Sequence, residues 1–241
     1  MEIVRKEYSF KSATGLCDIY ARSWAPADKD SVKAIFQITH GMAEHGERYA
    51  RFAKKLCEHG YAVFAQDHIG HGKSVASDDD LGYFGAKDGW RDFVIDCRSL
   101  TDIAREEYPG KPVVFFGHSM GSFLLRTYLY TYPGELSGAI ISGTGWQPEM
   151  TIRGGLLLAG AIARIKGPDA ASKLVTNMAF GAYNKAFGDK PRTPNDWLSA
   201  DTDNVDRYMA DPMCGAEATV GLFRQMLRGL RFNQTPGNID R

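Results

Sequence analysis

The segment GHSMG, residues 117–121, has the residue types and spacing of a serine nucleophile, because it fits the pattern G-x-S-x-G. In this pattern a sharp turn at the end of a strand lifts the serine hydroxyl clear of the sheet, and the glycines leave room for adjacent backbone. A continuous apolar run, residues 113–116, precedes the motif and an apolar helical spacing follows it, which is the required context. We therefore predict that Ser119 attacks acyl groups, rather than lying idle in a glycine-rich turn.

A second segment, ITHGMAEHGERY at residues 38–49, could supply part of the same site. Its pattern is that of a strand that ends in His-Gly and passes through a loop into a helix. Acyl transfer needs two N–H donors for the developing oxyanion, and removing one costs about 3–4 kcal/mol of transition-state stabilisation. We expect the backbone of Met120 to give one donor and the backbone of Met42 to give the other.

A serine nucleophile also needs a base, and the base needs an acid to orient it. Every histidine precedes Ser119 in the chain: His40, His45, His59, His68, His71 and His118. The side chain of His118 should point to the opposite face from that of Ser119, because neighbouring residues at a strand end alternate. His68 and His71 are expected to be satisfied loop histidines, and His45 could approach the site. The sequence identifies neither the base nor the acid.

The elements that must position these residues alternate between strand and helix. Two β segments, YSF and CDIYARSW, open the chain, with a turn at residues 14–15. Further strands are predicted within VKAIFQITHG, YAVFAQD, VVFF and GAIIS, and helices follow the first three, the second of them ending before Pro109. Continuous apolar strands indicate burial on both faces. The predicted fold class is therefore α/β, a mostly parallel sheet flanked by helices.

The pattern changes after about residue 145, where helical spacing and turn clusters replace strands. We predict three parts: the N-terminal part of an α/β core at residues 1–145, a helical cap at residues 146–231, and the start of a return to the core at residues 232–241. A cap in this position would cover the carboxyl edge of the sheet, where open α/β sheets keep their ligand sites.

Composition excludes several other classes of protein. Lys+Arg and Asp+Glu both number 29, so the formal net charge is zero and no nucleic-acid partner is indicated. The N-terminus lacks the apolar region of a secretory signal, and the longest apolar run, residues 154–163, is too short to span a bilayer. The four cysteines are widely spaced, which indicates buried reduced thiols in a cytoplasmic protein, without zinc or disulfides: Cys17, Cys57, Cys97 and Cys214.

Taken together, HGMAEHGERY, DHIGHGKS, GHSMGS and DWLSADTDNVDRYMADPMCG resemble the monoacylglycerol lipase and lysophospholipase branch of the α/β-hydrolase fold, in its bacterial form. The resemblance runs from the first strand to about Arg231. It implies a serine esterase that needs no metal or organic cofactor, with Ser119 as nucleophile and the amides of Met42 and Met120 as the oxyanion hole. It also implies that further residues shape the site: His40, Gly41, Glu44, His45, Arg48, Gly117, His118 and Gly121.

In that family the acid and the histidine lie on two further strands after the cap, whereas this sequence stops at NQTPGNIDR. We therefore expect a truncated or clipped form of a longer hydrolase, with the C-terminal strands and the rest of the triad outside this chain. An interior strand at residues 138–142 would then be left as an open apolar edge. Loss of a triad histidine costs on the order of 10⁶ in kcat, so the chain alone should be close to inactive.

Three other interpretations compete with the esterase. GKS in DHIGHGKS imitates a P-loop, but Asp67 stands where the first glycine should be. A metal hydrolase using His68 and His71 lacks a carboxylate–histidine cluster with ligand spacing. A non-catalytic ligand-binding homologue of the same fold stays open, because the missing base fits it.

The substrate is expected to be a small lipophilic ester, such as a monoacylglycerol or lysophospholipid. Apolar cap residues could line an acyl pocket, although ordinary packing is the simpler explanation for any one of them: Leu156, Leu157, Leu158, Ile162, Phe180, Tyr183, Phe187, Met209, Met213, Phe223 and Met226. The run at residues 154–163 could also make transient contact with a membrane surface. The missing C-terminal segment is a further candidate partner.

Overall fold

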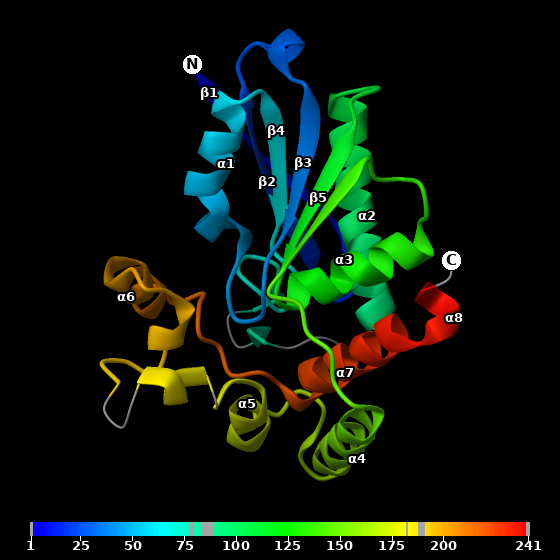
Figure 1. The fold of residues 1–241 in the computed structure, drawn as a ribbon, viewed down its shortest axis with the longest axis vertical. Coiled ribbons are helices and arrows are strands. Elements are labelled where there is room, and N and C mark those ends of the chain that lie inside the picture. Colours follow the sequence, from blue (N-terminus) through cyan, green and yellow to red (C-terminus); the bar gives the residue numbers. More distant parts are fainter. Residues whose placement is uncertain (1, 78–79, 83–88, 182, 188–190, 240–241) are drawn as a thin grey trace.

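A six-stranded mixed sheet forms the centre of the computed structural model, which describes residues 2–77, 80–82, 89–181, 183–187 and 191–239 (Figure 1). The strand order is β1-β2-β4-β3-β5-β6. An antiparallel hairpin at one side is formed by β1 (Ile3–Lys11) and β2 (Asp18–Pro26), and β2 is also antiparallel to β4 (Tyr61–Gln66). Both hairpin strands are longer than the predicted β segments. In β1 the missed part contains the consecutive charged residues Arg5, Lys6 and Glu7, which carry no apolar signal.

The other strands run parallel to β4 and end at the same edge of the sheet. They are β3 (Ala34–Thr39), β5 (Val113–His118) and β6 (Gly138–Ser142). Every residue of β3 is buried, as its continuous apolar run predicts. The predicted α/β class with a mostly parallel sheet is confirmed.

Helices cover both faces of the sheet. On one face lies α1 (Ala50–Glu58), whose Ala53 and Cys57 pack against Trp24 and Phe36. The other face carries α2 (Gly89–Glu107) and α3 (Met120–Thr131). The inward face of α2 consists of residues that are fully or almost fully buried: Phe93, Cys97, Leu100 and Ala104. Each fully buried large apolar side chain contributes about 1.5–3 kcal/mol, so this face fixes α2 against the sheet.

Beyond the carboxyl ends of the parallel strands lies the cap segment, which we define as residues 149–219 (Figure 1). It contains α4 (Glu149–Lys166), α5 (Lys173–Phe180) and α6 (Thr202–Ala210), with short 3-10 helices at Tyr183–Phe187 and Asp196–Leu198. The next helix, α7 (Val220–Gln234), packs on α4 and on the core helices α2 and α3. The predicted boundary at residue 231 falls inside α7, and the division into three parts stays a prediction.

The α7 helix is joined to the core by a close contact at Gly229. A Cβ at this position would overlap the ring of Trp90, so only glycine lets the helix approach α2 this closely. Trp90 also donates from its indole nitrogen to Thr127 on α3, at 2.9 Å. A short helix, α8 (Pro236–Ile239), follows α7. The contacts of α7 therefore fix the end of the cap segment to the sheet-bearing part of the molecule.

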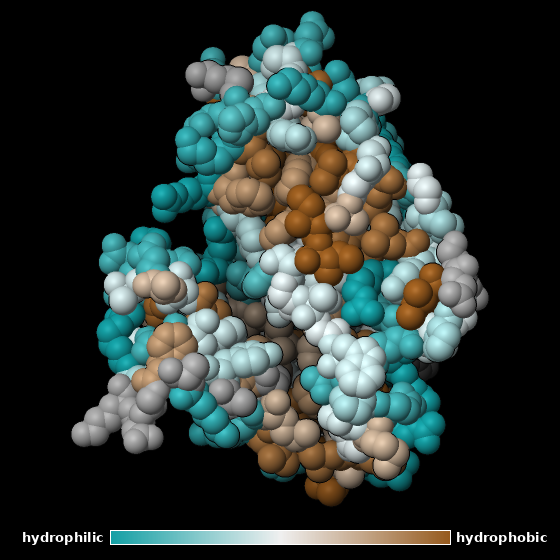
Figure 2. Space-filling view, viewed as in Figure 1, coloured by the Kyte–Doolittle hydropathy of each residue, from teal (hydrophilic) through white to brown (hydrophobic). Residues whose placement is uncertain are grey.

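The last parallel strand, β6, lies at the edge of the sheet and pairs only with β5 within the described part of the chain. Ile140 and Ile141 are 46% and 41% exposed there. Figure 2 shows hydrophobic side chains gathered on this face, where β5 and β6 lie in Figure 1. The expected open apolar edge is thus a feature of the structure.

All four cysteines are unpaired, but only two are buried as predicted. Cys57 and Cys97 lie in the core, whereas Cys17 and Cys214 are half-buried near loops. Among the described helices, none combines the length and the apolar character needed to cross a bilayer.

Candidate active site

Ser119 occupies the sharp turn between β5 and α3. Its backbone has φ 51° and ψ −117°, a conformation that a residue with a side chain adopts at a cost of about 1–3 kcal/mol. The turn is secured because the Ser119 amide donates to the carbonyl of Ser142 at 2.9 Å, and the Ser122 hydroxyl donates to the carbonyl of Ser119 at 2.6 Å. These backbone contacts hold the Ser119 side chain toward a cleft.

The glycines on either side of Ser119 are required by close backbone contacts. A Cβ at Gly117 would lie 2.5 Å from the carbonyl oxygen of Gly121. A Cβ at Gly121 would overlap the carbonyl oxygen of Thr39 at the end of β3. The predicted reason for the G-x-S-x-G spacing is therefore present in the structure, and it brings the start of α3 against the end of β3.

Two backbone amides beside Ser119 are available to a ligand. The loop at residues 40–45, which we call the 40–45 loop, contacts the serine directly, since a Cβ at Gly41 would lie 3.2 Å from the Ser119 Cβ. Within the described residues, the amides of Met42 and Met120 donate no hydrogen bond to the protein. The structure thus brings both predicted oxyanion donors to the side of the nucleophile.

His40 fixes the orientation of the peptide that contains the Met42 amide. The amide of His68 donates to His40 Nε2 at 2.9 Å, so the hydrogen of a neutral His40 ring is on Nδ1, which lies 2.7 Å from the Gly41 carbonyl oxygen. Burial lowers the pKa of His40 well below its usual value, with the neighbouring His68 adding to the effect, which keeps the ring neutral. Because the Gly41 carbonyl is held by His40, the Met42 N–H of the same peptide points the other way.

Glu44 ties the 40–45 loop to the helix that follows it. Its Oε1 accepts from the Gly41 amide at 2.7 Å and from the Tyr49 hydroxyl at 2.9 Å. Its Oε2 pairs with Arg48 at 3.1 Å. Burial, and then the Glu44 charge, raise the pKa of Tyr49 well above its usual value, so the phenol stays a donor. Glu44 thus links the Gly41 amide to Tyr49 and Arg48, and the role of Glu44 and Arg48 in shaping the site stays a prediction.

The cap segment is joined to the 40–45 loop at Ala43. Ala43 has φ 59°, and its carbonyl accepts from the Tyr208 hydroxyl of α6 and from the Gly215 amide, each at 2.9 Å. The Arg48 guanidinium lies over the Tyr208 ring, 4.8 Å from its centroid. Sequence analysis missed Tyr208, because its spacing in α6 is that of an ordinary buried helix residue.

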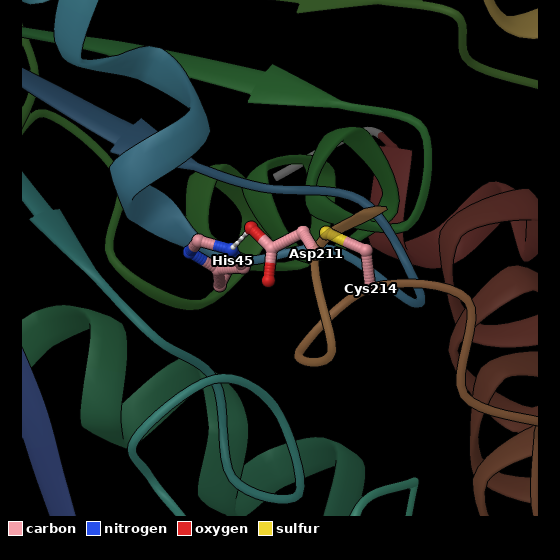
Figure 3. A group of neighbouring side chains, drawn as sticks. All are labelled: His45, Asp211 and Cys214. Carbon is pink, nitrogen blue, oxygen red and sulfur yellow. Dashed lines mark hydrogen bonds and ion pairs between the residues drawn. The ribbon is translucent and has the colours of Figure 1, made fainter. Parts of the chain in front are cut away.

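His45 forms a second contact between this loop and the cap segment. Its Nε2 lies 2.8 Å from Asp211 Oδ2, and Cys214 lies beside the same carboxylate (Figure 3). His45 therefore faces Asp211 and not Ser119. No motif could have indicated the pair, because the two residues are 166 positions apart.

A cleft of about 650 Å³ opens over Ser119, between the 40–45 loop and the cap segment. Of the apolar cap residues expected to line an acyl pocket, only Phe180 lines this cleft. The others lie elsewhere: some pack in the core, as Phe223 does, and others face outward, as Leu157 does at 77% exposure. The cap side of the cleft instead combines aromatic rings with side-chain amides: Phe180, Trp197, Tyr208, Asn177, Asn184 and Asn195.

The histidines do not provide a base for Ser119 in the described structure. His118 lines the cleft, but no hydrogen bond joins it to Ser119 among the described residues. His40 and His45 are engaged with the loop and with Asp211, and His59 is exposed at the end of α1. A base for Ser119 therefore stays unidentified within the described residues.

The expectation that His68 and His71 are satisfied loop histidines is wrong for His68. Neither ring nitrogen of His68 has a hydrogen-bond partner within the described chain; its ring packs 4.2 Å from the His40 ring and edge-on to Phe93 at 5.2 Å. Burial lowers its pKa to about 3. His71 does have a partner, since its Nδ1 lies 3.0 Å from the Ile69 carbonyl oxygen. The other ring nitrogen of His71, Nε2, has no partner within the described chain.

The loop that imitates a P-loop is organised by Asp67. Its carboxylate is paired with Arg22 and accepts from the amides of Gly46 and Lys73 at 2.8 and 3.0 Å. Burial acts to raise the pKa of Asp67, but the Arg22 contacts outweigh it and lower the pKa. A buried carboxylate at the centre of the loop supports the rejection of a phosphate site.

A strained serine at the end of a parallel strand, beside two free amides and under a helical cap segment, defines a serine hydrolase of the α/β-hydrolase fold. Comparison of the sequence with known families gives the same class. Residues 30–238 match the serine aminopeptidase S33 family, and the chain belongs to that family.

Its relatives include a monoacylglycerol lipase from Mycolicibacterium smegmatis, 31% identical over 92% of this chain and 72% of the relative. The monoglyceride lipase of Homo sapiens is 28% identical over 88% of this chain, which spans only 62% of that relative's length. Among solved structures, a thermostable carboxyl esterase from Bacillus coagulans in complex with glycerol superposes with a TM-score of 0.84 and 29% identity, covering 95% of this chain and 73% of that one.

Proposed function

We propose that the site hydrolyses carboxylic esters through an acyl-enzyme on Ser119. The observation that supports this most directly is the strained Ser119, which lines a cleft together with Met42 and lies beside the free amides of Met42 and Met120. The names of the relatives, monoacylglycerol lipase and carboxyl esterase, support ester chemistry over the peptide chemistry in the family's description.

In the proposed reaction Ser119 Oγ bonds to the ester carbonyl carbon while a base takes its proton. The carbonyl π electrons move to the oxygen, and the amides of Met42 and Met120 stabilise the resulting oxyanion. The tetrahedral intermediate then expels the alcohol, which receives the proton, and leaves the acyl-enzyme. Water repeats the sequence and releases the carboxylic acid and the free serine.

We propose a monoacylglycerol or a similar lipophilic ester as the substrate. The cleft joins two kinds of surface that such an amphiphile needs. Phe180 and Trp197 stack at 5.7 Å and offer an aromatic wall to an acyl chain, whereas amides such as Asn177 can bind the hydroxyls of a glycerol head group. A lysophospholipid shares the acyl chain but adds a phosphate, and no lysine lines the cleft in the described structure, where Arg48 pairs with Glu44.

We further propose that this polypeptide alone turns over esters slowly, because no histidine–carboxylate pair faces Ser119 in its described part. A site that has its oxyanion donors but lacks the base retains a rate acceleration of only about 10³–10⁴ over the reaction in water. Free imidazole, added as an external base, should then raise the turnover that depends on Ser119. A non-catalytic binding protein is the second candidate function, and the same missing pair favours it.

One experiment separates these candidates. The chain is incubated with a fluorophosphonate and with p-nitrophenyl esters of graded acyl length, each with and without imidazole, beside the variants Ser119→Ala and Ser77→Ala. Adduct mass and imidazole-dependent turnover should vanish in Ser119→Ala and persist in Ser77→Ala, an exposed serine. Absence of adduct and of turnover under all conditions would support the binding protein. Turnover unaffected by Ser119→Ala would overturn the assignment of the nucleophile.

We also propose that the surface formed by α4 and α7 contacts anionic membranes. A groove of about 710 Å³ lies between α4 and α7, with apolar and arginine side chains along it. Glu149 pairs with Arg231 and Arg153, whereas Arg224 and Arg228 pair with no acid in the described structure. These two cations lie beside exposed leucines, which is the combination that binds an anionic lipid surface.

Vesicle sedimentation tests the membrane contact. Binding to phosphatidylserine vesicles should exceed binding to phosphatidylcholine vesicles. Because a basic residue near such a surface contributes about 1 kcal/mol, Arg224→Gln with Arg228→Gln should weaken binding about 30-fold. Replacement of Arg98, which pairs with Glu135 on the core, is the matched control. Equal binding to both vesicles, or an equal loss in the control, would refute the contact.

A further inference from the structure

His45, Asp211 and Cys214 bring three different metal-binding groups together at the junction of the 40–45 loop and the cap segment (Figure 3). A ring nitrogen, a carboxylate oxygen and a thiol sulfur lie within 4.8 Å of one another. His45 comes from the loop after β3, and the other two come from the segment that follows α6. We propose that these three side chains form a zinc site that ties the cap segment to the 40–45 loop.

The local backbone presents the two cap residues to the same point. Asp211 Oδ1 accepts from the Met213 amide at 2.9 Å, and the Cys214 amide donates to the Asp211 carbonyl at 3.0 Å. This turn leaves Asp211 Oδ2 directed at His45 and places the Cys214 sulfur beside the same carboxylate (Figure 3). The donors are therefore held by a fixed turn on one side and by a buried ring on the other.

The donor set and spacing suit zinc. Zinc binds imidazole nitrogen, carboxylate oxygen and thiolate at about 2.0–2.3 Å, which places tetrahedral donors about 3.3–3.7 Å apart. Donors within 4.8 Å reach that spacing by shifts on the order of 1 Å. A mixed nitrogen, oxygen and sulfur set favours zinc over magnesium or calcium, which take oxygen donors. Water would fill the fourth position.

Zinc binding at this site should release one proton, from the Cys214 thiol. Burial, and then the Asp211 charge, raise the pKa of Cys214 to about 12, so the free thiol carries its proton at neutral pH. Zinc binding forms the Zn–S bond and releases that proton to solvent. Without metal, the His45 Nε2–H donates to Asp211 Oδ2, because a carboxylate only accepts. When Nε2 binds the metal, the single hydrogen of the ring lies on Nδ1, which has no partner within the described residues. One proton therefore leaves for each zinc ion bound.

The charges around the site oppose each other. Asp211 and Glu44 attract a cation. Arg48 repels a cation, and it lies close enough to Cys214 to act on the thiol. Arg48 is paired with Glu44 at 3.1 Å, which partly neutralises it. The thiolate and Asp211 together match the double charge of zinc, so the occupied site is electrically balanced.

Cobalt spectroscopy and zinc-dependent melting test the site in the folded chain. Bound Co²⁺ should give a thiolate-to-cobalt absorption band and tetrahedral visible bands, and Zn²⁺ should bleach both. The band should vanish in Cys214→Ser and persist in Cys17→Ser, which removes another half-buried thiol. Between pH 7.5 and 8.5 the affinity for Zn²⁺ should rise about tenfold, because one proton is released. Zinc at 100 times its dissociation constant should also raise the Tm by several degrees.

Several results would overturn the proposal. They are a folded wild-type chain without the cobalt band, a band that survives Cys214→Ser, or a zinc affinity that does not change with pH. Asp211→Asn removes the carboxylate while keeping its shape, and it should weaken Co²⁺ binding at least tenfold. An unchanged affinity in a folded Asp211→Asn protein would also refute the site, independently of any ester hydrolysis.

Discussion

Replacing Asp67 with asparagine should destabilise the protein strongly, because it removes the buried charged partner of the Arg22 guanidinium. The other acidic contact of Arg22 is longer, with Nε 3.5 Å from the partly exposed Glu47 carboxylate. The two side chains form a two-pronged ion pair, with Nη1–Oδ1 at 2.6 Å and Nη2–Oδ2 at 2.7 Å. Their exposed fractions are only 2% and 1%. The same carboxylate accepts from the Gly46 amide at the start of the short helix after His45, so its loss also loosens the 40–45 loop.

The expected magnitude follows from burial. Removing one partner of a buried ion pair costs about 3–5 kcal/mol. At about 2–4 °C for each kcal/mol in a chain of this size, the Tm should fall by roughly 6–20 °C. Arg22→Met should cost a similar amount, because it strands the carboxylate. The double variant Arg22→Met/Asp67→Asn buries no unpaired charge, so its cost should be smaller than the sum of the single costs by up to about 3 kcal/mol.

Thermal and urea unfolding followed by circular dichroism measure these costs. The exposed pair Arg192–Asp206 is a matched control, since it has the same 2.6 Å separation with exposed fractions of 46% and 56%. Asp206→Asn should change stability by less than about 1 kcal/mol. If Asp67→Asn costs no more than Asp206→Asn, or if the two buried substitutions are additive, the reasoning from burial is refuted.

Between pH 7 and pH 5 the protein should lose at least about 2 kcal/mol of stability, measured by urea unfolding. The buried rings of His40 and His68, whose pKa values are lowered by burial, stay neutral while the unfolded chain takes up two protons at about 2 kcal/mol each. Asp96, whose pKa burial raises to about 6, returns about 1.3 kcal/mol, and His71, whose pKa burial also lowers, adds to the loss. A flat profile would contradict the buried neutral rings. Gly121→Ala should abolish soluble expression because its Cβ overlaps backbone, whereas Gly154→Ala, with open space around it, should stabilise α4 by about 0.5–1 kcal/mol. Tyr208→Phe should cost about 1 kcal/mol in thermal unfolding, and no change would show that the bond to the Ala43 carbonyl is weak.

The core elements could be predicted because their signals are local. The apolar residues of α2 have helical spacing, and β3 and β5 are continuous apolar runs, as expected for elements buried between a sheet and its helices. Each pattern can be recognised from a few neighbouring residues in the sequence. Ser119 could be predicted for the same reason, since the strand, turn and helix that hold it are consecutive. The close contact of Gly121 with β3 shows why the spacing is strict.

The cap segment could not be predicted in the same detail, because its contacts join residues far apart in the chain. Apolar residues such as Leu157 and Phe223 resemble pocket residues in sequence, yet one is exposed and the other packs in the core cluster. The cleft is lined instead by residues such as Trp197 and Asn177 that carry no shared pattern. The path of the connecting loops decides which side chains reach Ser119, and composition does not record that path.

Ser119 and the peptide that contains the Met42 amide are held in place by different parts of the molecule. Ser119 is fixed by backbone contacts within the core, since its own amide bonds to Ser142 and α3 packs on the end of β3. The Met42 amide, in contrast, is adjacent to Ala43, whose left-handed backbone is held through its carbonyl by two groups of the cap side, the Tyr208 hydroxyl and the Gly215 amide. Release of the cap segment would therefore leave the nucleophile in place and free the peptide that presents the second oxyanion donor. A ligand that spans the cleft from Ser119 to the cap segment should favour the docked state and so stabilise the arrangement that binds the oxyanion.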